Sequence, residues 1–171
     1  MNKKDIKFLD KEDFEFIIKN TPLISIDLCV TNNNKLLIGK RLNEPAKYYY
    51  FVPGGRIYKN ETINEAIIRI CEQEIGIKKH MYKIEDLELL GIYEHFYTQN
   101  FFEKDHYNTH YIVMAYQINL NNIDSINKQN IFSQHSDLKW ISVENYIAKR
   151  GEEINFKIHK YTKNYLKKIK I

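Results

Sequence analysis

The sequence predicts a mixed α/β fold whose sheet is largely mixed or antiparallel. Runs of apolar and β-branched residues bounded by turn residues predict two groups of strands, and segments with helical spacing of apolar residues follow each group. The order is therefore strands, helix, strands, helix. The chain has 171 residues and shows no internal repeat, linker or low-complexity tract, so we expect one domain over residues 1–171.

The first elements are expected to be a helix and a β-hairpin. Residues 10–20 carry apolar residues at helical spacing, with Asp10 as the cap and Pro22 as the stop. Residues 23–30 (LISIDLCV) and 35–42 (KLLIGKRL) have the composition of strands. The letters TNNN between them are a turn signal, so the two strands are predicted to pair as a hairpin.

A strand, a glycine turn and a second helix follow. Residues 48–57 (YYYFVPGGRI) predict a third strand that runs into a tight turn at two glycines. Residues 62–76 predict a single helix, because Thr62 and Glu65 have the spacing of a capping box and Gly76 can close the helix.

The second half predicts two long strands and two helices. Residues 87–97 and 109–120 are rich in β-branched and aromatic residues, which favours strands. The loop of residues 98–108 between them is long enough to suggest a function. The remaining predicted elements are a short strand at residues 138–141, a short helix at 142–150 and a last helix at 155–169.

Composition limits the functional classes. The chain has 43% hydrophobic and 28% charged residues, no signal peptide and no apolar run long enough to cross a bilayer, so we expect a cytoplasmic globular protein. Cys29 and Cys71 lack metal-like spacing and are expected to be reduced packing residues. The net charge of +4 lies largely in the C-terminal segment, where a solvated lysine face is a better explanation than binding of nucleic acid or membrane.

A catalytic box with missing acids occupies residues 53–77. Five residues stand at the spacing of the Nudix box, G-x5-E-x7-R-E-U-x-E-E-x-G-U with U aliphatic, namely Gly55, Glu61, Arg69, Glu74 and Gly76. Ile70 and Gln73 stand where that pattern has glutamates. A plain amphipathic helix would explain the apolar face of this segment, but it would leave the preceding PGGR and the box spacing as coincidence.

The one remaining acid predicts a metal site with fewer carboxylate ligands. On a regular helix, positions 70, 73 and 74 share one stripe, and two of its three expected carboxylates are absent. One hard cation such as Mg²⁺ could still bind, because it accepts one or two carboxylates together with neutral oxygens, water and phosphate. Glu74 is the carboxylate candidate, and a backbone carbonyl of the Gly54–Gly55 turn is a natural second ligand.

Two further groups of side chains could serve a phosphate-containing substrate. Arg56 and Arg69 are candidates for binding diphosphate oxygens, although an ion pair of Arg69 with Glu61 or Glu65 is almost as good an explanation. Because box glutamates are missing, a general base would have to come from elsewhere. His135, next to Gln134, is the best-placed histidine, but spacing alone does not select it over His106 or His110.

Beyond the box, the chain resembles the GDP-mannose mannosyl hydrolases, a branch of the Nudix superfamily whose box is truncated in the same manner. The resemblance covers residues 10–142 and rests on ordered islands: TPLISIDL, LLIGKRLNEPA, YFVPGGRIYKNET, YEHFY, THY and QHSDLKWI. The last thirty or so residues are outside it. It implies the Nudix fold, with a mixed sheet sandwiched between helices (α/β/α), and a homodimer. From the sequence, the apolar N-terminal helix could complete this dimer or could equally pack within its own chain.

The resemblance also implies a reaction and its residues. Water adds to C1 of the sugar of a GDP-hexose with inversion, and GDP and the free sugar are released. One Mg²⁺, for which Mn²⁺ may substitute, is bound at the positions that match Gly54, Glu74 and Gln134. His135 matches the general base. The arginines and the tyrosine that assist departure of the leaving group match Arg41, Arg56, Arg69 and Tyr111. Asp27 and His95 match the residues that support the sugar cation.

Two other functions stay open. An ordinary Nudix pyrophosphatase would cleave a nucleotide sugar at phosphorus and give a nucleoside monophosphate and a sugar 1-phosphate. A module that binds nucleotide sugars without cleaving them would keep a damaged box for recognition. The resemblance does not distinguish mannose from other hexoses, and the contacts of loop 98–108 are not assigned.

Overall fold

A computed structural model describes residues 9–120, 135–148 and 155–170 of the chain. Among these residues, seven strands form one sheet of order β3-β2-β1-β6-β5, with β4 paired to β1 and β7 paired to β2. The strands are β1 Leu23–Asn32, β2 Lys35–Arg41, β3 Tyr50–Phe51, β4 Gly54–Arg56, β5 Glu88–Tyr97, β6 Thr109–Asn119 and β7 His135–Ser142. Strands β1 and β6 run parallel and the other pairs are antiparallel, so the predicted mixed sheet is confirmed.

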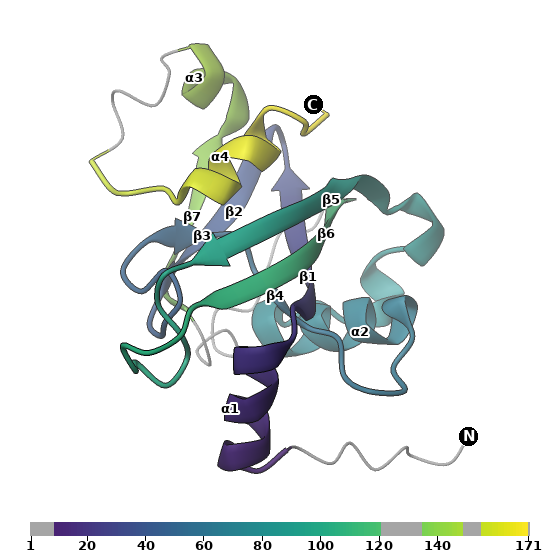
Figure 1. The fold of residues 1–171 in the computed structure, drawn as a ribbon. Coiled ribbons are helices and arrows are strands. Elements are labelled where there is room, and N and C mark those ends of the chain that lie inside the picture. Colours follow the sequence, from purple (N-terminus) through teal and green to yellow (C-terminus); the bar gives the residue numbers. More distant parts are fainter. Residues whose placement is uncertain (1–8, 121–134, 149–154, 171) are drawn as a thin grey trace.

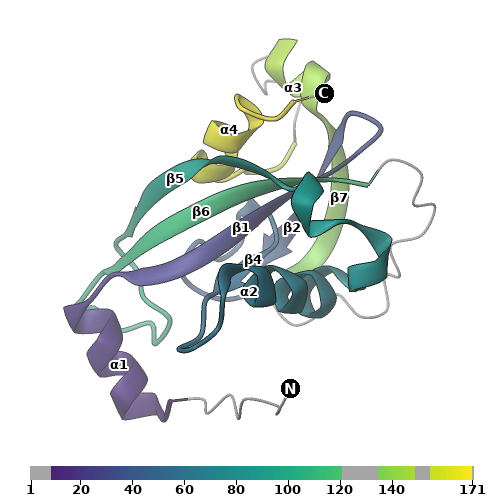
Figure 2. The ribbon, with the colours of Figure 1, turned by 90° about the vertical axis from the view of Figure 1, so that its right-hand side faces the viewer.

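Helices cover both faces of this sheet. They are α1 Lys11–Asn20, α2 Ile63–Ile70, α3 Val143–Ala148 and α4 Lys160–Leu166, with a π-helical turn at Cys71–Ile75 and 3₁₀ turns at Lys79–Met81 and Ile84–Asp86. Figures 1 and 2 show α2 against one face and α4 against the other, while α1 extends from the start of β1. The predicted α/β/α arrangement is therefore confirmed.

Alternation along the strands divides the core into two layers. On β1, Ile26, Leu28 and Val30 pack in the layer of α2, whereas Cys29 packs in the layer of α4. On β2, Leu37 faces α2 while its neighbours face α4. Because both faces of β1 are covered, this strand is buried over most of its length. Asp27, two residues before Cys29, bonds to Tyr165 of α4 and so lies on the same face as Cys29.

The hairpin between β1 and β2 is confirmed. Thr31 pairs with Leu36 and Asn32 with Lys35, which leaves Asn33 and Asn34 as a two-residue turn. Both turn residues have positive φ, at 46° and 59°, and asparagine tolerates this conformation better than most residues. The letters NN in the sequence therefore specify the turn directly.

Three predicted elements have different boundaries. The predicted third strand is divided into β3 and β4 by Pro53, which has no N–H to donate and whose carbonyl instead accepts from the Leu28 N–H at 2.8 Å. The predicted short strand at 138–141 is the centre of the longer β7. The last helix begins only at Lys160, because Ile158 forms a β-bridge with Tyr50 and His159 caps the helix.

The box helix is confirmed at its start and changes at its end. Thr62 and Glu65 form the capping box, and Gly76 closes the segment with a φ of 73°. The expected regular helix over residues 62–76 is wrong in its last turn, which is π-helical from Cys71 to Ile75. The extra residue in this turn changes which side chains share a face, so the uniform stripe of positions 70, 73 and 74 is not formed.

The N-terminal helix packs within the same chain. Asp10 caps α1 by accepting from the Asp13 N–H at 2.8 Å, as the sequence predicts. Phe14 makes edge-on contacts with the rings of Phe101 and Phe102 in the loop between β5 and β6.

Cys29 and Cys71 are both free and buried. Within the described ranges, no helix has the length and apolar character needed to span a membrane.

Candidate active site

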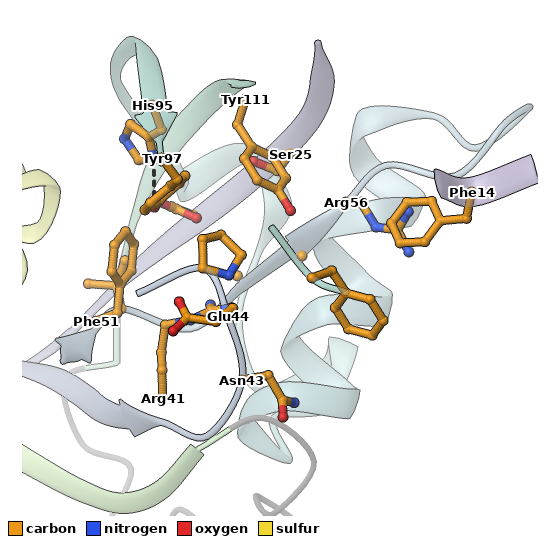
Figure 3. A pocket seen from close by; sticks show the side chains of 16 residues that line it. Phe14, Ser25, Arg41, Asn43, Glu44, Phe51, Arg56, His95, Tyr97 and Tyr111 are labelled. Carbon is orange, nitrogen blue, oxygen red and sulfur yellow. Dashed lines mark hydrogen bonds between the residues drawn. The ribbon is translucent and has the colours of Figure 1, made fainter. Parts of the chain in front are cut away.

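A cavity of about 190 Å³ opens beside the face of the sheet that carries α4. Six of the residues selected from the sequence line it: Asp27, Arg41, Gly54, Arg56, His95 and Tyr111. Figure 3 shows His95, Tyr97 and Tyr111 in one part of the site, Arg56 against Phe14 in a second, and Arg41 and Glu44 in a third, lower in the view. The cavity is smaller than the roughly 300–1,000 Å³ of pockets that bury drug-sized ligands, so a nucleotide sugar would extend beyond it.

Strand register brings these residues together from distant parts of the sequence. Asp27 lies on β1, between Gly54 of β4 on one side and Ala115 of β6 on the other. On the outer pair of strands, His95 lies directly opposite Tyr111. Since residues opposite each other share a face of the sheet, pairing alone places the imidazole beside the phenol.

The positive charge of the site comes from two guanidinium groups. The guanidinium carbon of Arg56 lies 3.9 Å from the centre of the Phe14 ring, a cation–π contact that holds the side chain in place. The Nε atom of Arg41 is buried and has no hydrogen-bond partner among the described residues. Both residues line the cavity, where these charges suit an anionic ligand.

A hydrogen-bonded chain through Tyr165 connects Asp27 and His95. The hydroxyl of Tyr165, on α4, donates to Oδ2 of Asp27 at 2.6 Å and lies 2.9 Å from Nε2 of His95. The other ring nitrogen of His95, Nδ1, lies 3.5 Å from the Tyr97 hydroxyl. The His95 ring also stacks on the Tyr161 ring with a centroid distance of 3.6 Å and an interplanar angle of 4°.

Burial controls the charge of both groups. It raises the pKa of Asp27 to about 7, against the lowering effects of the Tyr165 hydrogen bond and the charge of Arg41. Burial lowers the pKa of His95 to about 3, and repulsion from His159 and Lys160 acts in the same direction. Near neutral pH the His95 imidazole is therefore uncharged, whereas Asp27 is close to its point of half-ionisation.

Several residues of the site were not found by sequence reasoning. Tyr97 and Glu44 line the cavity, and Phe14 reaches it from α1. Tyr165 lies beneath it, in the segment that the family resemblance does not cover. The one available signal was the spacing of Tyr161 and Tyr165, which are four residues apart and therefore share a face of a helix.

The residues expected to hold a metal ion are only partly described. Glu74 is buried, with 7% of its surface exposed, and it does not line the cavity. Gln134 lies outside the described residues. For His135 the structure describes only the backbone, which pairs with Arg41 across β7 and β2. Its placement as a general base therefore stays a prediction.

Gly54 is enclosed so closely that no side chain fits there. A Cβ atom at this position would lie 2.5 Å from Oδ1 of Asp27 and 2.7 Å from the carbonyl oxygen of Ile26. The oxygen atoms close to Gly54 are those of the Asp27 carboxyl group and the Ile26 carbonyl, hard donors of the kind that Mg²⁺ accepts. In the described part of the chain, no three histidine, cysteine, aspartate or glutamate side chains cluster as a metal site, so neutral oxygens and phosphate would complete the coordination.

Arg69 is engaged in a structural ion pair. Its Nε and one terminal nitrogen donate to the two carboxylate oxygens of Glu61 at 2.7 and 2.8 Å, and the same terminal nitrogen donates to the carbonyl of Arg56. Tyr58 covers the guanidinium at 3.9 Å. The ion pair considered from the sequence is thus formed, and Arg69 links the box helix to the glycine turn. A contact of Arg69 with a diphosphate stays a prediction.

The two positions without box glutamates lie in different environments. Ile70 is completely buried, and an added Cβ at Gly55 would lie 3.2 Å from its side chain. Gln73 is exposed and accepts a hydrogen bond from Arg69 at 3.4 Å. The isoleucine is therefore part of the core that supports the glycine turn.

Replacing Ile70 by glutamate tests this assignment. Ile70→Glu would bury an uncompensated charge, and we expect it to lower the free energy of unfolding by on the order of 3–5 kcal/mol. Gln73→Glu is the matched control at an exposed position and should change stability by no more than about 0.5 kcal/mol. Urea denaturation without added metal measures both. Equal stabilities of the two variants would contradict the core role of Ile70.

Burial of Asp27 predicts a pH dependence of stability. Its native pKa of about 7 lies above the ordinary value of 3.8, so the native state keeps a proton that the unfolded chain releases between these values. The contribution of Asp27 to the free energy of unfolding is therefore greatest below about pH 4 and is lost as the pH rises through about 7. Asp27→Asn should weaken this dependence by a few kcal/mol, on the order expected for such a shift. Denaturation between about pH 4 and pH 8 in a chelator checks it, and parallel profiles would refute the assignment.

Comparison with known proteins identifies the family. The model of the NUDIX domain family matches residues 21–161. The low-salt glycan biosynthesis protein Agl8 of Haloferax volcanii is 37% identical over 128 residues, which cover 75% of this chain and 76% of that protein. An ADP-ribose pyrophosphatase of Methanocaldococcus jannaschii is 33% identical over 92 residues, 54% of this chain and 50% of that protein.

Solved structures show the same fold at low sequence identity. A MutT NUDIX hydrolase from Burkholderia pseudomallei has a TM-score of 0.65 and 16% identity, covering 88% of this chain and 100% of its own. The NUDIX domain of Shewanella oneidensis NrtR, solved with ADP-ribose, has a TM-score of 0.59 and 14% identity, covering 94% of this chain and 96% of its own. With the box spacing, the α/β/α sheet and the family match in agreement, the chain belongs to the NUDIX hydrolase family.

Proposed function

We propose that this protein hydrolyses a GDP-hexose, with GDP-mannose as the first candidate, to GDP and the free sugar. Water forms a bond to C1 of the sugar while the bond from C1 to the diphosphate oxygen breaks, and GDP leaves with the electron pair. The configuration at C1 is inverted. The runner-up is hydrolysis of a nucleotide sugar at phosphorus.

The charged groups that line the cavity carry this proposal. Arg41 and Arg56 provide two positive charges, and Asp27 provides a carboxyl group. Cleavage at C1 creates negative charge on the departing diphosphate and positive charge on the sugar ring. A cavity that offers groups of both signs suits that distribution better than transfer at phosphorus, where charge develops on phosphoryl oxygens.

The Tyr111 hydroxyl suits contact with the leaving group. Burial raises the pKa of its phenol, although the nearby Arg56 and Arg41 act against this rise. The hydroxyl therefore stays protonated at neutral pH and can donate a hydrogen bond to a diphosphate oxygen. A neutral donor beside two arginines stabilises the anionic product without adding negative charge to the site.

Asp27 and His95 fit the sugar side. A positive charge that develops on the sugar would favour the ionised carboxylate of Asp27 and lower its pKa below the value of about 7 in the empty cavity. His95 is held neutral by burial, so it does not repel that positive charge. The Asp27 carboxylate and the neutral His95 ring would together stabilise an oxocarbenium-like sugar.

A divalent cation belongs to this proposal. Glu74, the Gly54 carbonyl and Gln134 would hold one Mg²⁺ or Mn²⁺, which when bound neutralises charge on the diphosphate of the leaving group. The single box carboxylate is consistent with this role, since additional acids would repel the phosphates.

The names of the relatives give limited support. Agl8 of Haloferax volcanii is named for glycan biosynthesis, which agrees with a sugar-nucleotide substrate and with a role in polysaccharide biosynthesis. The cytoplasmic location and the homodimer implied by the resemblance also belong to the proposal.

One observation favours the runner-up reaction. The chain shares 33% identity over 92 residues with an ADP-ribose pyrophosphatase, and it keeps the ion pair of Glu61 with Arg69 within the box. Against it, Ile70 lies in the core and Gln73 carries no charge, so the box lacks two of the acids that would bind metals at phosphorus.

Hydrolysis in ¹⁸O-labelled water distinguishes the two reactions. We expect the label in the free sugar and none in the nucleotide, because water attacks carbon. Mass spectrometry of the products of GDP-mannose with Mg²⁺ measures this. Label in a nucleoside monophosphate or in a sugar 1-phosphate would establish attack at phosphorus, and absence of any product across several GDP-hexoses would favour a binding module.

Replacing the expected base tests the role of His135. His135→Gln should lower kcat by about 10²–10⁴-fold, the usual contribution of a general base, and leave the affinity for GDP nearly unchanged. His106→Gln is the matched control in the loop between β5 and β6, where the sequence offered an alternative histidine. Steady-state kinetics and calorimetric titration with GDP measure both properties. Wild-type activity of His135→Gln would remove His135 from the mechanism.

A further inference from the structure

Tyr165 connects the two groups on the sugar side of the cavity without lining the cavity itself. Its side chain is completely buried, and its hydroxyl contacts both Oδ2 of Asp27 and Nε2 of His95. It lies on α4, beyond the segment that matches the family model. We propose that Tyr165 is a positioning residue through which α4 orients Asp27 and sets the tautomer of His95 for the reaction.

Both ends of α4 are attached to the sheet, so the hydroxyl is held in place. At its start, the His159 N–H donates to the Tyr50 carbonyl at 3.0 Å, and the hydroxyl of Tyr161 bonds to the N–H and the carbonyl of Phe96 at 2.7 and 3.0 Å. Beyond its end, the backbone of Lys170 exchanges two hydrogen bonds with the Gln117 side chain, at 2.8 and 3.0 Å. Tyr165 lies between these attachments.

The geometry specifies a direction for the hydrogen bonds. When Asp27 is ionised, its carboxylate can only accept, so the single proton of the Tyr165 hydroxyl is donated to it and the Tyr165 oxygen accepts from His95. His95 then carries its proton on Nε2. Nδ1 is left as an acceptor, and it faces the hydroxyl of Tyr97. The order of donation is Tyr97, His95, Tyr165, Asp27.

This order assigns distinct roles to the two groups. Both nitrogens of His95 are engaged, so the ring has no free nitrogen with which to accept a proton from water. Oδ2 of Asp27 is engaged with Tyr165, while Oδ1 is turned toward Gly54, which lines the cavity. The carboxylate therefore presents one defined oxygen on the side of the glycine turn. Stacking of His95 on Tyr161 fixes the plane of the ring as well.

The catalytic consequence rests on the proposed function, but the hydrogen-bond order does not. NMR correlation of the ring nitrogens with ring protons reports the tautomer of each histidine, and comparison with His95→Gln assigns the signals of His95. In the wild-type protein without substrate, at a pH above the Asp27 pKa of about 7, we expect a proton on Nε2 of His95. A wild-type ring protonated on Nδ1 would overturn the proposal before any Tyr165 variant is made.

Tyr165→Phe removes only the hydroxyl. We expect His95 to lose its single tautomer, and kcat for GDP-mannose to fall by about 10- to 100-fold with little change in KM, as for other partners that orient reacting groups. Tyr93→Phe is the matched control. Its ring contacts that of Tyr165 with a centroid distance of 5.0 Å, but its hydroxyl donates to the Leu90 carbonyl. This control should keep both the tautomer and kcat.

The two measurements separate this inference from the proposed function. An unchanged His95 spectrum in Tyr165→Phe, or an unchanged kcat in an active enzyme, overturns the positioning role. If the wild-type protein hydrolyses no GDP-hexose, the proposed function fails and the NMR comparison alone decides whether Tyr165 sets the tautomer. If Tyr165→Phe does not fold, the tautomer of the wild-type protein makes that decision.

Discussion

A carboxyl group buried in the central strand of the sheet is the constraint on which the site depends. Asp27 has only 8% of its surface exposed, and a charge in that position must be compensated by its neighbours or lost by protonation. The neighbours are supplied by separate elements: a hydroxyl from α4, a guanidinium from β2 and a glycine of β4 that approaches because it has no side chain. These contacts link the two ends of the chain around one side chain.

The truncated box follows the same electrostatic logic. A site that gathers two arginines and a phenol for an anionic leaving group is weakened by every additional carboxylate nearby. Ile70 replaces one acid with core packing beneath the glycine turn, and exposed Gln73 replaces another with a neutral partner for Arg69. The box spacing of Glu61 and Arg69, which bond to each other, therefore has a structural role that is separate from its chemistry.

Strand positions and turn chemistry could be predicted because they depend on neighbouring residues. The turn at Asn33 and Asn34 and the capping box at Thr62 are local, and both formed as expected. The π-helical turn after Ile70 was missed. The late start of α4 was missed because it depends on a contact with a distant residue. The β-bridge of Ile158 with Tyr50 keeps extended a segment whose composition alone favours helix.

By itself the sequence determined the types of element and the box spacing, since periodicity, turns and motifs are written along the chain, and with the family resemblance it pointed to six residues that line the cavity. Only the tertiary structure decided how charges are distributed among them. In the packed fold Arg69 forms an ion pair with Glu61, burial lowers the pKa of His95, and Tyr165 bonds to Asp27, 138 residues away in the sequence. Burial and hydrogen bonding depend on which surfaces meet, and that is a property of the packed fold rather than of local sequence.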